Sequence, residues 1–368
     1  MWTLRLLTLS LLTVTAAPLI HTDWWPIRLW DFPRLQILAT ASFLTIYTLA
    51  LTWHCRLKQG SLALLGILLA IIVWQATYII PYTSAWPHAI PTATSSDVSI
   101  LVCNLDKRNT QHDAVAQMLR DSQSDILILV ELDQAWADAL SDVRANFPHR
   151  SEIVLEDGLG LALWSKHPLD NPQIRHIVSD KRPSIFATLT INNHDVRLVA
   201  IHPTPPALRV PHEDERYDSG IRDAELILLA KEVKDNPQAN WIVAGDFNDV
   251  AWSRTTALFS SISGLLDPRV GRGLINTYHA QYPLMRYPLD HVFVSEHFAV
   301  RSFDRIETPG SDHFAVRVEL ALVPHASQKN QPDEDDAEEA AEIIEEGVEE
   351  AAEHDENVSD PPEADPNT

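Results

Sequence analysis

Hydrophobic residues follow three different patterns along this chain. The first third contains long uncharged runs, the middle contains short apolar runs separated by polar residues, and the remainder is dominated by acidic and small residues. Long runs are typical of membrane helices and short ones of buried strands, whereas a highly charged segment cannot bury enough apolar surface to fold. We therefore divide the chain into a membrane region at 1–85, a folded domain at 97–325 and a disordered acidic tail at 328–368.

Two runs in the first part, at 35–53 and 61–80, contain no charged residue. A helix needs about 20 apolar residues to cross a bilayer, and both runs reach that length. A third run, at 6–20, is shorter, and it is either a third span or the apolar core of a signal peptide. The pattern predicts two or three transmembrane helices, at about 4–20, 35–54 and 61–82.

Basic residues beside these runs predict the orientation in the membrane. The loop between the second and third runs carries Arg56 and Lys58 and no acid, and Arg5 precedes the first run. Because basic residues concentrate in cytoplasmic loops, we expect this loop and the N-terminus in the cytoplasm. Three crossings then place everything after Tyr82 on the other side, and cleavage of the first run would leave that side unchanged.

The middle of the chain alternates between strand and helix patterns. Helical stripes cover 115–119, with Asn109 or Thr110 as the expected N-cap, and 226–233. Such alternation predicts an α/β domain in which packed sheets have helices outside. Short apolar runs predict strands at 99–103, 126–130, 196–201, 241–244, 290–295 and 314–320.

Charge and cysteine content exclude several classes of protein. The net charge is −23, divided into +3 before Asp97, −17 from Asn330 onward, and −9 between them. A domain with this balance is not a globally basic nucleic-acid binder, since such binding depends on neutralising phosphates. Two cysteines exclude a disulfide scaffold and a cysteine-rich zinc site. Ala and Glu at 337–353 favour helix, but the tail lacks balancing cations.

Polar residues gather where the predicted strands begin or end. An Asp or Asn after a single strand is usually a turn former, whereas polar groups at six strand ends indicate an assembled site. Carboxylate and carboxamide oxygens are hard ligands that favour Mg²⁺ or Mn²⁺, which leaves the imidazoles for proton transfer. This inventory suits metal-assisted hydrolysis of a phosphoester. The residues are Asn104, Asp106, Glu131, His202, Asp246, Asn248, Asp290, Asp312 and His313.

With these motifs in this order, the chain resembles the endonuclease/exonuclease/phosphatase superfamily, metal-dependent phosphoesterases similar to deoxyribonuclease I. The resemblance covers about 98–322. It implies an α/β fold, a four-layer α/β/β/α sandwich with two packed mixed β-sheets, here preceded by transmembrane helices and followed by the disordered tail. The motifs are Asn104-Leu105-Asp106, Glu131, His202-Pro203, Gly245-Asp246-Phe247-Asn248, Leu289-Asp290-His291 and Ser311-Asp312-His313.

The resemblance also implies a metal and phosphate pocket. Glu131 resembles the main metal ligand, and Asn104, Asp106 and Asp312 line the same pocket, where Asn104 is also expected to contact the substrate. The implied metal is Mg²⁺, with Mn²⁺ or Ca²⁺ as alternatives. Val130 stands where the family often has Gln, a departure that removes no ligand.

Catalytic roles are implied in the same way. Asp246 resembles the residue that orients or deprotonates the attacking water, and Asn248 resembles the donor to the phosphate. His313 resembles the imidazole held against the phosphoryl group, with Asp290 as its partner carboxylate. His202 resembles the second imidazole, which assists the leaving oxygen, although some members have tyrosine there.

These roles lead to one principal hypothesis and two alternatives. The principal one is a membrane-anchored, Mg²⁺-dependent phosphoesterase of the nuclease type. The first alternative is a phosphatase or a phospholipase-C-like or sphingomyelinase-like hydrolase of lipid headgroups, which the membrane tether favours. The second is a catalytically silent binding module, against which the complete set of motifs argues. Among the basic residues, Arg222 is the best candidate for binding substrate phosphate, because it opens a helix beside the expected site.

The implied partners are a phosphoester substrate, either nucleic acid or a phospholipid headgroup, and the lipid bilayer, with no obligate protein partner evident. Trp24, Trp25 and Trp30 suit the membrane interface. The run Trp30-Asp31-Phe32-Pro33-Arg34-Leu35-Gln36 resembles a bacterial subgroup in which hydrophobic segments precede this domain. That likeness implies a multi-pass protein of the bacterial inner membrane with its catalytic domain on the periplasmic or extracellular side.

Overall fold

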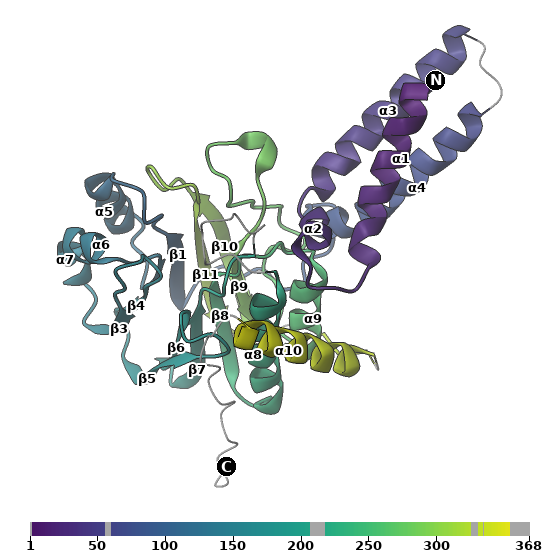
Figure 1. Ribbon diagram of the computed structural model, residues 1–368. Coiled ribbons are helices and arrows are strands. Elements are labelled where there is room, and N and C mark those ends of the chain that lie inside the picture. Colours follow the sequence, from purple (N-terminus) through teal and green to yellow (C-terminus); the bar gives the residue numbers. More distant parts are fainter. Residues whose placement is uncertain (1, 56–59, 207–217, 325–329, 334, 354–368) are drawn as a thin grey trace.

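Three apolar helices form a projection beside a folded domain (Figure 1) in the computed structural model, which describes residues 2–55, 60–206, 218–324, 330–333 and 335–353. They are α1 (Trp2–Ala16), α3 (Arg34–Cys55) and α4 (Ser61–Ile79). With the 3-10 turns η1 (Ala17–Leu19) and η3 (Ile80–Tyr82), all three are long and apolar enough to cross a membrane. The shortest predicted run is therefore a helix of the same kind as the other two.

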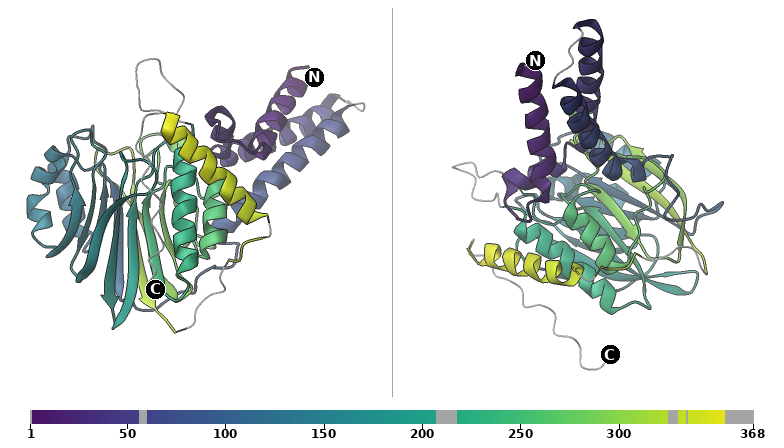
Figure 2. Two further views of the ribbon diagram at one scale, coloured as in Figure 1. Left: turned by 60° about the horizontal axis from the view of Figure 1, so that its bottom comes forward. Right: turned by 90° about the vertical axis from the view of Figure 1, so that its right-hand side faces the viewer.

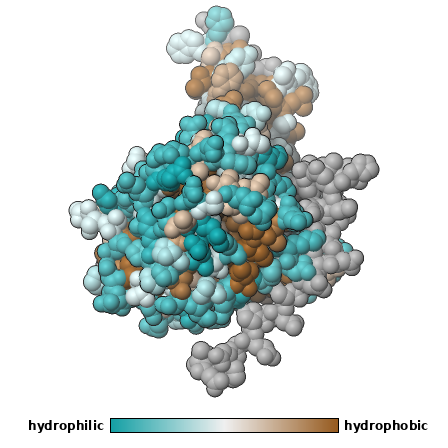
Figure 3. Space-filling model, turned by 90° about the vertical axis from the view of Figure 1, so that its left-hand side faces the viewer, coloured by the Kyte–Doolittle hydropathy of each residue, from teal (hydrophilic) through white to brown (hydrophobic). Residues whose placement is uncertain are grey.

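The three helices pack on one another through apolar side chains, including Leu4 and Leu68. Gln75, the one strongly polar side chain of the 61–80 run, is buried and has two partners. It donates to the Thr15 hydroxyl at 3.2 Å and accepts from Arg34 at 3.4 Å. Figure 3 shows the projection as mostly apolar, behind a domain whose near face is mainly hydrophilic. This contrast fits a projection that lies in lipid and a domain that lies in water.

Two mixed sheets form the centre of the domain. The first has the strand order β10-β11-β1-β2-β4-β3, and the second has the order β5-β6-β7-β8-β9. The first sheet contains β1 (Val98–Asn104), β2 (Ile126–Val130), β3 (His149–Ile153), β4 (Leu161–Ser165), β10 (Phe298–Ile306) and β11 (Ala315–Leu322). The second contains β5 (Leu169–His176), β6 (Pro183–Ile191), β7 (His194–Ile201), β8 (Asn240–Asp246) and β9 (Asp290–Val294).

The six predicted strands correspond to β1, β2, β7, β8, β9 and β11. Of the five strands that the sequence analysis did not predict, β3, β5 and β10 lie at sheet edges. Edge strands are partly exposed, so they lack the continuous apolar run that identifies a buried strand. The remaining two, β4 and β6, carry apolar runs that the analysis did not single out.

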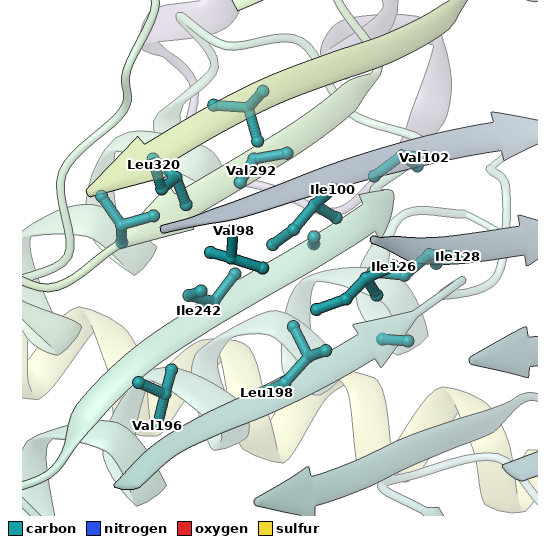
Figure 4. Close-up of a cluster of buried hydrophobic side chains, with 14 of the residues drawn as sticks. Val98, Ile100, Val102, Ile126, Ile128, Val196, Leu198, Ile242, Val292 and Leu320 are labelled. Atoms are coloured by element: carbon teal, nitrogen blue, oxygen red, sulfur yellow. The ribbon is translucent and has the colours of Figure 1, made fainter. Parts of the chain in front are cut away.

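Helices cover the outer faces of both sheets and complete the predicted four-layer α/β/β/α sandwich (Figure 2). The first sheet is covered by α5 (His112–Asp121), α6 (Gln134–Ala139) and α7 (Ser141–Arg144), and the second by α8 (Gly220–Asp235) and α9 (Arg254–Ser263). Between the sheets, Ile100 and Val102 of β1 pack in one core with Leu198 and Ile242 of the second sheet (Figure 4). Both faces of β1 are buried, because Leu101 packs against the outer helices instead.

The predicted N-cap of α5 is wrong, because the helix begins at His112 and Gln111 precedes it. Asn109 instead makes two hydrogen bonds outside the helix. Its side-chain oxygen accepts from the Gln111 N–H at 2.9 Å, and its side-chain nitrogen donates to the Pro309 carbonyl at 2.8 Å. The Asn109 amide therefore joins two loops that are far apart in sequence, which a local capping rule does not foresee.

Part of the predicted disordered tail is a helix, α10 (Asp336–Glu353), that packs on α8 and α9 (Figure 2). Its buried side chains include Ala340, Ile343 and Ala351. These positions recur every three to eight residues on one face of α10, so the helix is amphipathic. Its apolar face covers apolar side chains of α8 and α9. Arg254 of α9 also forms an ion pair with Glu339. The rest of the predicted disorder, at 354–368, lies outside the described residues.

Candidate active site

The sheet topology brings the predicted motifs to one edge of the sandwich. β1 runs parallel to β2, and β7 runs parallel to β8, so the residues that follow each pair leave the sheets together. β11 is antiparallel to β1 and β9 is antiparallel to β8, so their first residues lie at the same edge. Asp246, at the end of β8, is directly opposite Asp290, at the start of β9. The ends of these strands therefore bring the predicted motifs, from Asn104 to His313, into one site.

An amide nitrogen at the centre of this edge touches two carboxylates. Nδ2 of Asn104 lies 3.2 Å from Oε1 of Glu131 and 3.0 Å from Oδ2 of Asp246. The Asn104 oxygen accepts from the Asp106 N–H at 3.0 Å, and the second Glu131 oxygen accepts from the Lys107 N–H at 3.0 Å. Both sheets contribute to this cluster, since Asn104 ends β1 and Glu131 follows β2 in the first sheet, and Asp246 ends β8 in the second.

The backbone is strained at three predicted site residues. Asp106, Glu131 and Asn248 have φ angles of 55°, 63° and 52°, in the left-handed region that costs free energy for residues other than glycine. Gly245 has a φ of 154°, and a Cβ there would lie 1.9 Å from the Ile201 carbonyl oxygen. The glycine is therefore required for β8 to approach β7 just before Asp246.

A buried aspartate holds the site histidine. Nδ1 of His313 lies 2.8 Å from Oδ2 of Asp290, and its Nε2 lies 3.6 Å from Oδ2 of Asp246. Burial alone would lower the pKa of His313, but the carboxylates of Asp290 and Asp246 outweigh it and raise that pKa to about 10. The imidazole is therefore protonated at neutral pH, with its Nδ1 proton donated to Asp290.

Burial has the opposite consequence for Asp246, whose side chain is almost fully enclosed. Desolvation and the neighbouring charge of Asp290 raise the pKa of Asp246 to about 7, although His313 acts against them. One Asp246 oxygen accepts from the Asn248 N–H at 2.9 Å. Asp246 is thus a carboxyl group that is held in place and exchanges its proton near neutral pH.

The second predicted imidazole, His202, is neutral. Burial and the charge of Arg182 hold the pKa of His202 well below its ordinary value. Nη1 of Arg182 lies 3.4 Å from His202 Nδ1, and because a guanidinium can only donate, the imidazole proton is on Nε2. Asn248 is nearby, and its side-chain nitrogen donates to the Pro203 carbonyl at 2.9 Å.

Asp106 and Asp312 meet on a cation that the sequence analysis missed. Nη2 of Arg108 lies 3.0 Å from Oδ2 of Asp312, and its Nε lies 3.0 Å from Oδ1 of Asp106. Asp312 lines the cleft described below, whereas Asp106 does not. The Arg108 side chain is 74% exposed, so its two ion pairs lie at the mouth of the site. The signal in the sequence is the position of Arg108 two residues after the Asn-x-Asp motif.

Arg222 lies in the first turn of α8, beside the site, and it is buried. Its side chain is 1% exposed and pairs with Asp223 at 2.6 Å, and it also donates to the Asn248 carbonyl at 2.8 Å. Asp249 lies 3.6 Å away on the same guanidinium. Among the described residues of the cleft wall, Arg222 is absent. These contacts favour a positioning role for the loop that carries Asn248, and direct binding of substrate by Arg222 stays a prediction.

The site opens into a cleft of about 630 Å³ with two kinds of wall. One wall carries the polar residues Glu131, His202, Asp246 and His313 with their neighbours. The other is apolar, and the sequence analysis did not foresee it. The tryptophan-rich segment between the first two hydrophobic runs supplies part of this wall, whereas its sequence alone indicates only a position at the membrane interface. The apolar wall consists of Trp25, Leu29, Trp30, Phe32, Pro33, Met285, Tyr287 and Leu289.

The described residues thus form an α/β/β/α sandwich with carboxylates, carboxamides and an aspartate-held histidine at one edge. The family model described as the Endonuclease/Exonuclease/phosphatase family matches residues 101–313, more than half of the chain. The chain therefore belongs to this family of phosphoester-bond hydrolases, as the motifs predicted.

Solved structures with a similar fold have low sequence identity. Humanized TDP2 from D. rerio is 17% identical with a TM-score of 0.49, covering 61% of this chain and 99% of that one. An endonuclease/exonuclease/phosphatase from Beutenbergia cavernae is 16% identical with a TM-score of 0.48, covering 62% and 72%. Sphingomyelinase C from Streptomyces griseocarneus is 16% identical with a TM-score of 0.44, covering 61% and 99%. No curated protein sequence matches this chain.

Proposed function

We propose that this protein is a membrane-anchored phosphoesterase that uses a divalent metal ion and an activated water. The observation that carries the proposal is the single Asn104 amide shared by Glu131 and Asp246, beside the buried Asp290–His313 pair. Turn-forming residues at separate strand ends would not share hydrogen-bond partners across two sheets. The arrangement therefore supports an assembled catalytic site over a silent binding module.

The donor atoms fit a hard divalent cation. Oε1 of Glu131 lies beside the Asn104 side-chain amide, and Asp312 lines the same cleft, so carboxylate and carboxamide oxygens are available to a hard cation. We propose Mg²⁺, with Mn²⁺ or Ca²⁺ as alternatives, held chiefly by Glu131. When bound, the ion would neutralise the carboxylates and the charge that develops on the phosphoryl oxygens. Asp246, Asp290 and His313 also offer ligand atoms within 4.8 Å of one another, but we assign that group to proton transfer, because His313 Nδ1 is already used by Asp290.

Asp246 is the residue that we assign to the attacking water. Its raised pKa, about 7, makes it a base that is ionised in part at neutral pH and able to take a proton from water. His313 would donate from Nε2 to a non-bridging phosphoryl oxygen, as a cation kept protonated by Asp290. His202 is neutral with its proton on Nε2 and lines the same cleft. We assign it to donate a hydrogen bond to the leaving oxygen, which takes its proton from solvent, because a neutral imidazole is too weak an acid to give up its own proton.

The helical projection supports membrane anchoring and orientation. The domain lies beside the C-terminal ends of α1 and α4 and the first residue of α3, whereas the N-terminus lies at the far end of the projection (Figure 1). The last turn of α3 and the first turn of α4 also lie at that far end, and Arg56 and Lys58 stand between these two helices in the sequence. Under the positive-inside rule, we propose a multi-pass protein of a bacterial inner membrane with the domain on the periplasmic or extracellular side.

Hydrolysis of bis(p-nitrophenyl) phosphate by the full chain in detergent tests the proposed chemistry. We expect turnover with Mg²⁺ and loss of turnover with chelator. Glu131→Gln should lower kcat/KM by about 100-fold or more, since even indirect partners of metal ligands typically contribute about 10–100-fold. Glu307→Gln, an exposed residue outside the cleft, is the matched control. Turnover that persists in chelator, or a Glu131→Gln variant as active as the control, would contradict the proposal.

A further inference from the structure

The apolar wall of the cleft indicates which class of phosphoester the site binds. We propose that the substrate is a membrane lipid, whose phosphoester enters the polar half of the cleft while its apolar part stays in the bilayer. This inference rests on the proposed function and adds the substrate class to it. It reverses the preference for nucleic acid that the sequence analysis expressed.

The first observation is the origin of the apolar wall. Trp25 and Trp30 line the cleft together with His313, and they belong to α2 (Trp25–Arg28) and the 3-10 turn η2 (Leu29–Asp31). These elements connect α1 to α3, two helices that are long and apolar enough to span a membrane. The segment must therefore lie at the membrane surface, and one wall of the cleft is part of that surface.

The second observation is an exposed apolar loop, at 282–285, that adjoins this wall. Tyr282 is 58% exposed, Leu284 is 84% exposed and Met285 is 57% exposed. The Leu284 carbonyl accepts from Nε2 of Gln36 at 2.7 Å, and Gln36 is the third residue of α3. The loop tip, including the 3-10 turn η4 (Pro283–Met285), is thus level with the start of a proposed membrane helix (Figure 1). Exposed apolar side chains at that level would lie in lipid rather than in water.

The same loop is joined to the catalytic residues. Tyr278 forms a backbone bridge with His313, and the Ala280 N–H donates to the Asp312 carbonyl at 2.7 Å. The exposed apolar loop is therefore attached by its backbone to the strand start that carries the imidazole assigned to the phosphoryl group, and Met285 of the loop lines the same cleft as that imidazole.

The charge and size of the cleft also fit a lipid headgroup better than a nucleic acid. Among the described residues that line it, the positively charged ones are Lys107, Arg108, Arg182 and the protonated His313, and the middle of the chain carries −9. Nucleic-acid binding draws on many phosphate contacts, whereas one phosphoester needs only a few cations. A volume of about 630 Å³ is in the range of small-molecule sites, about 300–1,000 Å³.

The test uses the full chain reconstituted in vesicles of phosphatidylethanolamine and phosphatidylglycerol. Release of the lipid headgroup phosphate is compared with hydrolysis of bis(p-nitrophenyl) phosphate and of single-stranded and duplex DNA. The variant is Leu284→Ser, whose side chain is exposed and so is not needed for folding. The control is Ile174→Ser, which removes an apolar side chain that is 41% exposed on β5, outside the cleft.

We expect wild type to hydrolyse vesicle lipid faster than either DNA. Leu284→Ser should lower the ratio of lipid to bis(p-nitrophenyl) phosphate hydrolysis by about tenfold, as expected for a lost apolar contact with lipid, and Ile174→Ser should leave that ratio at the wild-type value. Hydrolysis of the soluble diester and DNA without hydrolysis of lipid would overturn the inference and leave the proposed function standing. An unchanged ratio in Leu284→Ser would also overturn it. Failure to hydrolyse any of the phosphoesters would overturn both.

Discussion

Replacing Asp290 with asparagine should lower the pKa of His313 while leaving its imidazole in the same position. The side chain keeps its shape and its oxygen can still accept from Nδ1, but the carboxylate charge 2.8 Å from the imidazole is lost. Raising the pKa of His313 from 6.5 to about 10 corresponds to about 5 kcal/mol of preference for the protonated form. Asp290 shares this effect with Asp246 and Asp312, so we assign it about half or more, about 2–3 kcal/mol.

The pH dependence of kcat reports the loss. In wild type, activity should rise as Asp246 ionises near pH 7 and fall as His313 loses its proton near pH 10. Without the Asp290 charge, burial lowers the pKa of His313, so the alkaline limb should move below about pH 8. A loss of about 2–3 kcal/mol corresponds to about two pH units, so we expect kcat to fall about fourfold or more at pH 8.5 and about 20-fold or more at pH 9.5, as the deprotonated imidazole no longer donates to the phosphoryl oxygen.

The free energy of unfolding should also depend on pH through the proton of His313. Because folding raises the pKa of His313, the pair stabilises the folded chain fully below pH 6.5, and this stabilisation is lost as pH rises through about 10. The difference in unfolding free energy between wild type and Asp290→Asn should therefore be largest at pH 6 and small above pH 10. Asp304→Asn, at an exposed position of β10, is the control. An alkaline limb that stays near pH 10 in Asp290→Asn would refute the assigned pairing.

Three further changes test the positions assigned to neighbouring features. Gly245→Ala should destabilise the fold by about 3 kcal/mol, measured by thermal unfolding, because its Cβ would lie 1.9 Å from the Ile201 carbonyl oxygen; a stability equal to wild type would contradict this. Arg222→Lys should lower kcat about tenfold without raising KM, whereas a raised KM would support the role of binding substrate. Deleting residues 336–368 should cost about 2–4 kcal/mol in denaturant unfolding, because Ile343 and its neighbours on α10 cover α8; an unchanged stability would show that α10 is not docked.

Local patterns determined much of this protein. Runs of uncharged residues identified two apolar helices and left the run at 6–20 open between a third span and a signal peptide, and short apolar runs identified six of the strands. Both patterns depend only on neighbours along the chain. The motifs around Glu131, Asp246 and His313 were sufficient to identify the family, which the match over residues 101–313 confirms. In each case the residues carry the signal themselves, whatever surrounds them.

Tertiary structure decided what those residues do for one another. Strand order, which arises from contacts between distant segments, placed Asn104 between Glu131 and Asp246 and turned Arg222 inward onto Asn248. The same non-local packing gave the acidic segment at 336–353 an apolar surface on which to form α10. It also set an exposed loop beside α3 to complete the apolar side of the cleft. These outcomes depend on contacts between residues far apart in sequence, which no local pattern encodes.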